Sequence, residues 1–361
     1  MNDANELISF IASMSGEGNL RVEENLGEGY VRLRVSEAER RQAKHDIQHV
    51  EDIVIEMLRN ARDAGADKVY LATTKEDGVR TLVFLDNGSG VPQDMQERIF
   101  DARVTSKLES MKMDRWGVHG RGMALFSIKQ NTDEACVVAS DVDLGSVFKV
   151  SVATDRLGER ADQSSWPQAV KDEDGHYVCA RGPHNIIRAA CEFALEELRA
   201  CDVYLGSPSE IAATLHAQAS SRLDASRLLF IDDEAELPVV DRLGLASDAE
   251  DFIRICSGLG LEMSERTAHR ILAGQIKPVR GVTARLLRER DSSSHASAPV
   301  DLAKDRRGLR IAKDDMAQFS RAVERDFNDL ASRYYLNLCG DPKIRVSRDR
   351  ITVTFDLAKE E

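Results

Sequence analysis

Three short segments carry residue types that could act together on a phosphorylated ligand. The segment from 56 to 64 supplies two carboxylates and an amide at Glu56, Asn60 and Asp63. Spacings of four and seven residues place all three on one face of a helix. A carboxylate can accept a proton from water, and an amide oxygen is an acceptable ligand for Mg²⁺. Considered alone, the segment also fits an amphipathic helix whose polar face is simply solvated.

The second segment, Asp86-Asn-Gly-Ser-Gly90, follows the apolar residues 82–85. This order predicts a strand that ends at Asp86 and then a turn, since Asn-Gly and Ser-Gly are turn dipeptides. A carboxylate at the end of a strand can accept a hydrogen bond from an exocyclic amine such as that of adenine. Two glycines would let the backbone approach the ring closely. Turns that bind no ligand often carry the same pattern.

The third segment, Gly117-Val-His-Gly-Arg-Gly-Met123, is a Gly-rich loop that precedes a helical pattern over 123–129. Backbone N–H groups at the start of a helix bind phosphate, helped by the helix dipole. A tight turn needed only for packing is the alternative. Three such segments in one order, within the length of a single domain, favour a nucleotide site.

The ordered set resembles the GHKL superfamily of ATPases, which includes type II topoisomerase ATPase subunits, the large heat-shock chaperone, sensor histidine kinases and MutL proteins. Gly145-Ser146 stands where the family has its Gly-Thr strand motif. Thr105-Ser106-Lys107 resembles an element of MutL and topoisomerase VI B subunits that histidine kinases do not usually carry. The resemblance covers about residues 46–153. It implies an α+β fold with a Bergerat-type sandwich, in which helices cover one face of a mixed sheet.

The resemblance also implies ATP and Mg²⁺ as cofactors, with Glu56 as the general base for hydrolysis and Asn60 as the magnesium ligand. Asp86 would read adenine. For Lys107, an exposed loop lysine is an equal alternative to a phosphate contact. The implied ATP-binding residues are Asn60, Asp63, Ala64, Asp86, Gly88, Gly90, Thr105, Lys107, Gly117, Gly120, Arg121, Gly122, Met123 and Ser146, with the glycines at 117, 120 and 122 on a mobile lid.

In MutL and topoisomerase VI a lysine from the following domain reaches the γ-phosphate. Lys277, in Ile276-Lys-Pro278, is the candidate here, and an ordinary surface lysine is the alternative. Hydrolysis is therefore expected to be slow. His45 and His49 stand four residues apart in the sequence. This spacing could bind a metal ion or mimic a phosphoacceptor His-Asp pair. No third ligand accompanies them, so we expect an ordinary helix surface.

The segment from Ser247 to Arg290 predicts three helices, capped by Ser247 and Ser264 and interrupted near Gly258 and Gly274. Residues 264–278 resemble the recognition helix and following turn of phage-repressor helix-turn-helix domains. A small helical bundle with a solvated arginine face is the alternative. The residues that would contact DNA are Arg266, Thr267, His269, Arg270 and Lys277.

The chain of 361 residues is longer than one core usually organises, which predicts several domains. We expect an N-terminal arm (1–45), the ATP-binding domain (46–185), a helical connector (186–245), the helix-turn-helix module (246–290), a linker (291–299) and a C-terminal helix with strands (300–361). Within these, 186–204 is predicted to be helical, and 158–183 to be a polar excursion or lid. The helix of the last segment is expected over 314–335 and its strand over 344–357, split near Asp349.

The net charge of −13 disfavours diffuse binding to nucleic acid but is compatible with a local basic module. The sequence shows no long apolar run and no basic N-terminal leader, so we expect a cytoplasmic protein without membrane contact. Its six cysteines are far apart, which favours neither a zinc site nor disulfides.

These patterns together predict a Mg-dependent ATPase of the GHKL type. It would be an ATP-gated switch or dimerising clamp that forms a homodimer with nucleotide and acts on DNA or on a DNA-bound protein partner. Two alternatives use the same fold: a histidine or serine protein kinase, and a non-catalytic ATP-sensing regulator that binds DNA.

Overall fold

The computed structural model describes residues 22–106, 112–114, 117–119, 122–160, 162–198, 200–223, 231, 233–287, 319–325, 327–328, 336–340, 342–346 and 351–359. The chain divides into two compact units, residues 1–287 and 288–361. The first unit holds the sheet and every residue predicted for the nucleotide site.

A five-stranded sheet forms the centre of the first unit. Only its edge strand β12 runs parallel to a neighbour, β3, and the other pairs are antiparallel. The mixed α+β architecture predicted from sequence is thereby confirmed. Asp77 and Gly78 both have positive φ, as a tight hairpin between β3 and β4 requires. The sheet order is β12 (Asp202–Gly206), β3 (Lys68–Glu76), β4 (Val79–Asp86), β9 (Ser146–Ala153) and β8 (Glu134–Ser140).

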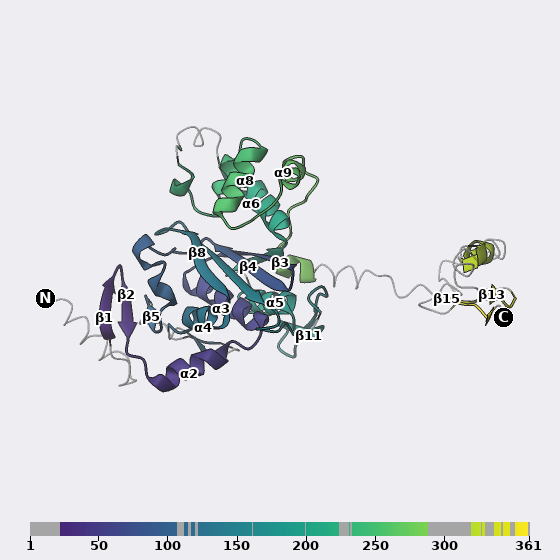
Figure 1. Ribbon diagram of the computed structural model, residues 1–361, viewed down its shortest axis with the longest axis horizontal. Helices are drawn as coiled ribbons and strands as arrows, with labels where there is room; N and C mark the ends of the chain where they lie inside the picture. The colour runs from purple at the N-terminus through teal and green to yellow at the C-terminus, as the bar shows by residue number, and fades with distance from the viewer. Residues whose placement is uncertain are drawn as a thin grey trace. The chain divides into compact units, whose positions relative to one another are not determined.

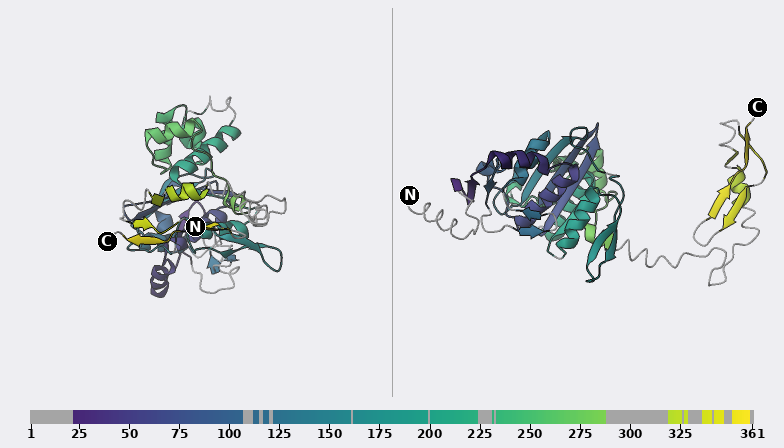
Figure 2. Two further views of the ribbon diagram at one scale, coloured as in Figure 1. Left: turned by 90° about the vertical axis from the view of Figure 1, so that its right-hand side faces the viewer. Right: turned by 90° about the horizontal axis from the view of Figure 1, so that it is seen from below.

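One face of the sheet is covered by α3 (Val50–Asp63), α4 (Ala124–Asn131) and α5 (Ile186–Glu196) (Figure 1). The right-hand view of Figure 2 looks at this helical layer from below. The apolar side chains of α3 recur at helical spacing and reach the sheet, so its opposite face is left to the polar residues. This is the arrangement expected for the segment that carries Glu56.

A break in the helical conformation separates α2 from α3. Helix α2 (Glu37–Asp46) ends at Asp46, and Ile47 has an extended backbone. The Asp52 carboxylate accepts the backbone N–H groups of Gln48 and His49, both at 2.9 Å, and so fixes the start of α3. His45 and His49 therefore lie on either side of the break. The prediction that they share one helix surface is wrong.

The N-terminal segment joins the fold from residue 22 onward. Its strands form a small sheet in the order β1 (Val22–Gly27), β2 (Tyr30–Leu33) and β5 (Val104–Thr105). The Leu33 backbone N–H also donates to the Arg103 carbonyl at 3.0 Å. The expected arm thus contacts the segment that carries Thr105.

Helices also cover the opposite face of the sheet. There α6 (Pro208–Arg222), α8 (Ala249–Gly258) and α9 (Glu265–Leu272) bury a second apolar cluster against Tyr70, Val83 and Leu85 (Figure 1). Ser207 and Glu210 form the predicted capping box of α6. The cap of α8 is Asp248 rather than the predicted Ser247, because the Asp248 side chain accepts the Asp251 N–H.

The helical pattern predicted for 186–204 is wrong at its C-terminal end, where α5 stops at Glu196 and 202–206 form β12. Val203 and Leu205 fill the core on one face while Tyr204 stacks on Tyr70 across the other, an alternation typical of a strand. The sheet therefore extends beyond the domain boundary expected at 185.

The polar segment 158–183 contains the hairpin β10 (Gln168–Lys171) and β11 (Tyr177–Arg181), and it packs on the helical layer through Trp166 and Ala169. The remaining short elements are β6 (Lys112–Asp114), β7 (Gly117–His119), η1 (Gln93–Met95), η2 (Arg98–Phe100), η3 (Glu234–Glu236) and η4 (Arg242–Leu245), together with a helical segment over 282–287.

The second unit contains helical residues at 319–325 and 327–328 within the predicted span 314–335. Strand β14 (Lys343–Val346) pairs with β15 (Ile351–Thr354), in agreement with the split predicted near Asp349. Strand β13 (Leu336–Leu338) pairs with β16 (Leu357–Lys359). The predicted linker over 291–299 lies outside the described residues.

Candidate functional site

A cavity of about 500 Å³ lies between the helical layer and the ends of β4 and β9. Residues from all three predicted segments and from both additional motifs line it. The predicted residues in its lining are Glu56, Asn60, Asp63, Ala64, Asp86, Gly90, Thr105, Gly122, Met123 and Ser146. The chain therefore brings together groups that are up to ninety residues apart in sequence.

The remaining residues predicted for the nucleotide site fall into three groups. Gly88 does not line the cavity but supports a residue that does. Gly117 lies in β7, of which only the backbone is described. Lys107, Gly120 and Arg121 lie outside the described residues.

Helix α3 presents its polar face to the cavity. Arg59, which the sequence analysis did not select, is 3% exposed and donates from Nη1 to Oε1 of Glu56 at 2.7 Å. Glu56 and Asn60 both line the cavity. The Asn60 Nδ2 atom is buried and has no hydrogen-bond partner in the part of the chain that is described.

Asp86 ends β4 at the floor of the cavity and is 4% exposed. Its Oδ1 accepts the Gly88 N–H at 2.8 Å, which fixes the carboxylate in place. Across the sheet Asp86 pairs with Ser146, whose hydroxyl accepts a hydrogen bond from Ser140 at 3.2 Å. Ser146 is thus placed beside Asp86 in the lining of the cavity.

Two glycines at this floor are required by backbone packing. Gly90 has φ +71°, and a Cβ there would stand 1.8 Å from the Asp141 carbonyl oxygen. Gly145 has φ +78°, and a Cβ there would stand 2.2 Å from the Asp86 carbonyl oxygen. No side chain fits at either position. The turn 141–145 therefore packs directly on the turn that carries Asp86.

The opposite end of the cavity is formed by the start of α4. Met123, its N-cap, and the next two residues line the cavity. Gly122 has φ +66° and accepts the Arg103 N–H at 2.8 Å. The first turn of a helix has unpaired N–H groups and a partial positive charge, which together attract anions. A phosphate chain would fit best at this end.

Further lining residues come from the N-terminal segment and were not selected from the sequence. Glu39 lies on α2 and forms an ion pair with Arg103. No sequence motif marks these residues, because they approach the cavity through contacts between distant segments, β2 with β5 and α2 with α4. Additional members of this group are Tyr30, Gln42 and Asp46. Lys277, the candidate γ-phosphate lysine, is exposed and is not among the lining residues.

Helix α9 presents a separate surface. Ser264 caps it, and Ala268 and Ile271 are buried against the second core. The predicted DNA-contacting residues divide by exposure. Arg266, His269, Arg270 and Lys277 are exposed, and Thr267 is half-buried. Most of the predicted set is therefore accessible on one side of the module.

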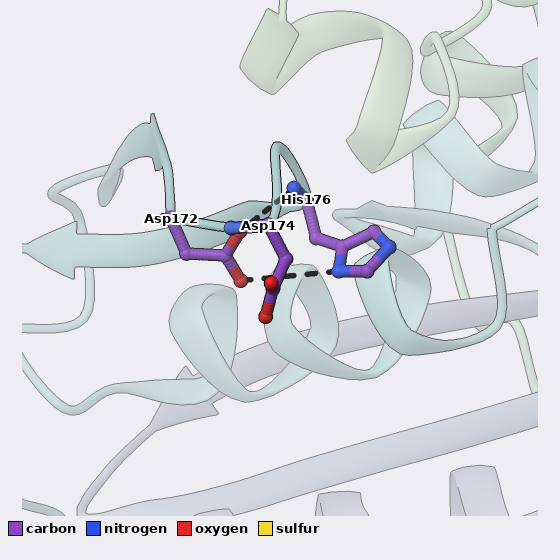
Figure 3. A group of neighbouring side chains, drawn as sticks. All are labelled: Asp172, Asp174 and His176. Atoms are coloured by element: carbon purple, nitrogen blue, oxygen red, sulfur yellow. Dashed lines mark hydrogen bonds and ion pairs between the residues drawn. The ribbon is translucent and has the colours of Figure 1, made fainter.

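One further group has metal-ligand chemistry, at the tip of the β10–β11 hairpin. Ligand atoms of Asp172, Asp174 and His176 lie within 4.8 Å of one another, and all three side chains are exposed (Figure 3). The Asp172 Oδ1 atom accepts the backbone N–H groups of Asp174 and His176, at 3.1 and 2.8 Å. These bonds explain the cluster as a turn, and we assign no function to it.

Comparison with known proteins gives two matches. Residues 47–143 match the family described as "Histidine kinase-, DNA gyrase B-, and HSP90-like ATPase". A similar curated protein is the "DNA mismatch repair protein MutL" of Pediococcus pentosaceus, with 30% identity over 115 residues. The aligned part covers 31% of this chain and 17% of that protein, so the chain matches about a sixth of its relative's length. Among the described residues, no helix is long and apolar enough to cross a membrane.

Proposed function

We propose that this protein, whose residues 47–143 form a domain of the GHKL superfamily, resembling the MutL branch, is a Mg-dependent ATPase that works as a slow conformational switch. The observation that carries the proposal is the convergence of Glu56, Asn60 and Asp86 on one cavity of about 500 Å³. A cavity of this size is within the range of small-molecule sites.

The cavity fits ATP at both ends. Buried Asp86 offers a carboxylate to an exocyclic amine, which suits adenine. The start of α4 offers N–H groups to phosphate. Asn60 lines the cavity and would hold Mg²⁺ through its side-chain oxygen. The ion would neutralise phosphate charge when bound.

Glu56 would serve as the general base. Its carboxylate lies one helical turn before Asn60 on the cavity face of α3, and Arg59 holds one of its oxygens at 2.7 Å. A base must stand within hydrogen-bond reach of the water whose proton it accepts. The hydrogen bond from the buried Arg59 guanidinium restricts the rotamers open to this carboxylate.

The test compares Glu56→Gln with Glu76→Gln, which removes an exposed carboxylate at the end of β3. Glu56→Gln is expected to retain Mg-ATP binding and to lower phosphate release at least about a hundred-fold, the usual range for a general base. Glu76→Gln should match the wild type. Unchanged phosphate release in Glu56→Gln would overturn the assignment, and transfer of labelled γ-phosphate to protein would favour the kinase alternative.

The proposal includes DNA as a target of the α8–α9 module. Arg266 and Arg270 are exposed on α9, one helical turn apart, while the apolar side of α9 is buried. This is the disposition in which a recognition helix can enter the major groove. If DNA is retained in response to ATP even by Glu56→Gln, the non-catalytic regulator is the better description.

We also propose that nucleotide promotes a homodimer. The measurement is the solution mass of the full chain with and without a non-hydrolysable ATP analogue and Mg²⁺. A mass that doubles with the analogue and not with adenosine supports a clamp. The mass of one chain in both states would leave a monomeric switch, and the mass of two chains in both states would show a dimer that does not depend on nucleotide.

A further inference from the structure

Arg103 lies at the phosphate end of the cavity and is held there by its backbone. Its N–H donates to Gly122 at 2.8 Å, and its carbonyl accepts the Leu33 N–H at 3.0 Å. Its φ is +62°, in the left-handed region that residues with a side chain rarely adopt. Such a conformation is strained for a residue with a long side chain, and it persists only where the surroundings impose it.

The Arg103 side chain is buried but its hydrogen-bonding capacity is not filled. The side chain is 9% exposed, and Nη2 donates to Oε1 of Glu39. The buried Nε atom donates no hydrogen bond within the described residues. A guanidinium offers five N–H groups in a planar fork that suits carboxylate and phosphate. A buried guanidinium whose N–H groups are only partly paired is unfavourable, unless another anion can accept hydrogen bonds from them.

Glu39 belongs to α2, which lies across the same end of the cavity. Hydrogen bonds from Ser36, and then the contact with Arg103, lower the pKa of its carboxyl, so Glu39 is charged at neutral pH. Asp46, from the same helix, also lines the cavity. A charged Glu39 carboxylate at the end that suits phosphate would repel a nucleotide. The Glu39 carboxylate thus pairs with the Arg103 guanidinium, which a phosphate oxygen could otherwise bind.

We propose that Arg103 binds nucleotide phosphate and that Glu39 occupies it when no nucleotide is present. Phosphate and α2 then compete for one guanidinium, and nucleotide binding releases α2 from the site. This inference rests on the proposed function, since it requires a nucleotide in the cavity. It adds a phosphate-binding residue outside the Gly-rich loop and a direct link from the nucleotide to the N-terminal segment.

The first experiment titrates adenosine, ADP and a non-hydrolysable ATP analogue against the full chain by calorimetry. Arg103→Gln should weaken binding of ADP and the analogue by roughly ten- to a hundred-fold, the value of one charge-assisted contact, and leave adenosine binding unchanged. Glu39→Gln should tighten ADP binding several-fold, because a competing anion is removed. The substitution Glu39→Gln keeps a side-chain oxygen at this position. That oxygen can accept the Ser36 backbone N–H, the 2.9 Å hydrogen bond that caps α2.

The matched control is Arg32→Gln. Arg32 lies on β2 and pairs with Asp101 at 2.8 Å, but it does not line the cavity. Its loss should leave the affinity for all three ligands unchanged. Thermal unfolding without ligand shows whether each variant is folded. Arg103→Lys, which keeps the charge, should recover part of the affinity for ADP.

A second measurement uses the wild type alone, so it does not depend on how the variants fold. Amide hydrogen exchange in α2 (Glu37–Asp46) should accelerate with ADP and not with adenosine. Equal losses of adenosine and ADP affinity in Arg103→Gln, or unaltered exchange in α2, would overturn the inference. If the wild type binds none of the three ligands, the proposed nucleotide function itself fails.

Discussion

At the scale of single residues, the site depends on where a few polar groups are buried. Asp86 is a carboxylate at 4% exposure whose position is set by the Gly88 N–H. Burial of a carboxylate is costly unless hydrogen bonds compensate, and the Gly88 N–H supplies one of these bonds. Ser146 stands opposite it on β9 and contributes a second polar group to the floor.

We predict that Asp86→Asn weakens ATP binding about ten- to a hundred-fold and narrows the preference for ATP over GTP. An amide nitrogen would face the adenine amine donor to donor, whereas it can donate to the guanine carbonyl. Titration with both nucleotides measures the effect. Asp143→Asn is the control, because Asp143 is exposed with φ +59°, a conformation that asparagine tolerates. An unchanged ATP preference in Asp86→Asn would contradict adenine recognition by this carboxylate.

At the scale of elements, the two turns at the floor hold each other. The Asp143 N–H donates to the Ser89 carbonyl at 2.8 Å, and Gly90 lies against Asp141. The turn between β8 and β9 therefore supports the turn after β4. Beyond it, the Val239 N–H donates to the Leu144 carbonyl at 2.9 Å, which connects the floor to the second helical layer.

We predict that Gly90→Ala lowers the free energy of unfolding by more than about 3 kcal/mol, since it combines a left-handed φ with a steric clash. Gly175→Ala is the matched control: its φ is +84°, but nothing lies within 4 Å of the added carbon. Gly175→Ala should lower the free energy of unfolding only by the cost of a left-handed φ in alanine, about 1 kcal/mol. Denaturant unfolding monitors both variants. Equal losses of stability would show that the contact with Asp141 is not the cause.

Helix α9 allows a second prediction at this scale. Arg266→Ala and Arg270→Ala should each weaken DNA binding and reduce the slope of log affinity against log salt by about one, if each arginine contacts a phosphate. Fluorescence anisotropy at several salt concentrations measures this. Arg181→Ala removes an exposed arginine from β11 and should have no effect. Salt slopes that match the wild type in both α9 variants would exclude α9 as the DNA-binding element.

At the scale of the whole molecule, the sheet is enclosed by helices on both faces within residues 1–287. Tyr70, Leu85 and Val147 face the second layer and are fully buried there. Each such side chain contributes about 1.5–3 kcal/mol through burial. The helical module is therefore part of the folded unit that holds the nucleotide site.

We predict that a chain ending at residue 287 folds and binds nucleotide like the full protein, whereas one ending at 206 aggregates. The shorter chain lacks α6, α8 and α9 and exposes the apolar face of the sheet. Solubility, thermal unfolding and nucleotide titration compare the two. A soluble and cooperatively unfolding chain of residues 1–206 would show that the second layer is dispensable.

The sequence by itself determined the elements of the site. Helical spacing put Glu56, Asn60 and Asp63 on one face, and turn chemistry after an apolar run placed Asp86 at the end of β4. These patterns are local, so they can be read along the chain. The mixed sheet followed from the family resemblance carried by those motifs.

Only the tertiary structure decided which distant groups meet. The Glu39–Arg103 pair forms because the N-terminal segment packs on the fold, β2 against β5 and α2 against α4. The second helical layer forms because apolar side chains on both faces of the sheet must be covered. The strand at 202–206 also depended on contacts made elsewhere in the fold, since it pairs with β3. Contacts between distant segments leave no periodic signal in a single sequence, so these features could not be predicted from it.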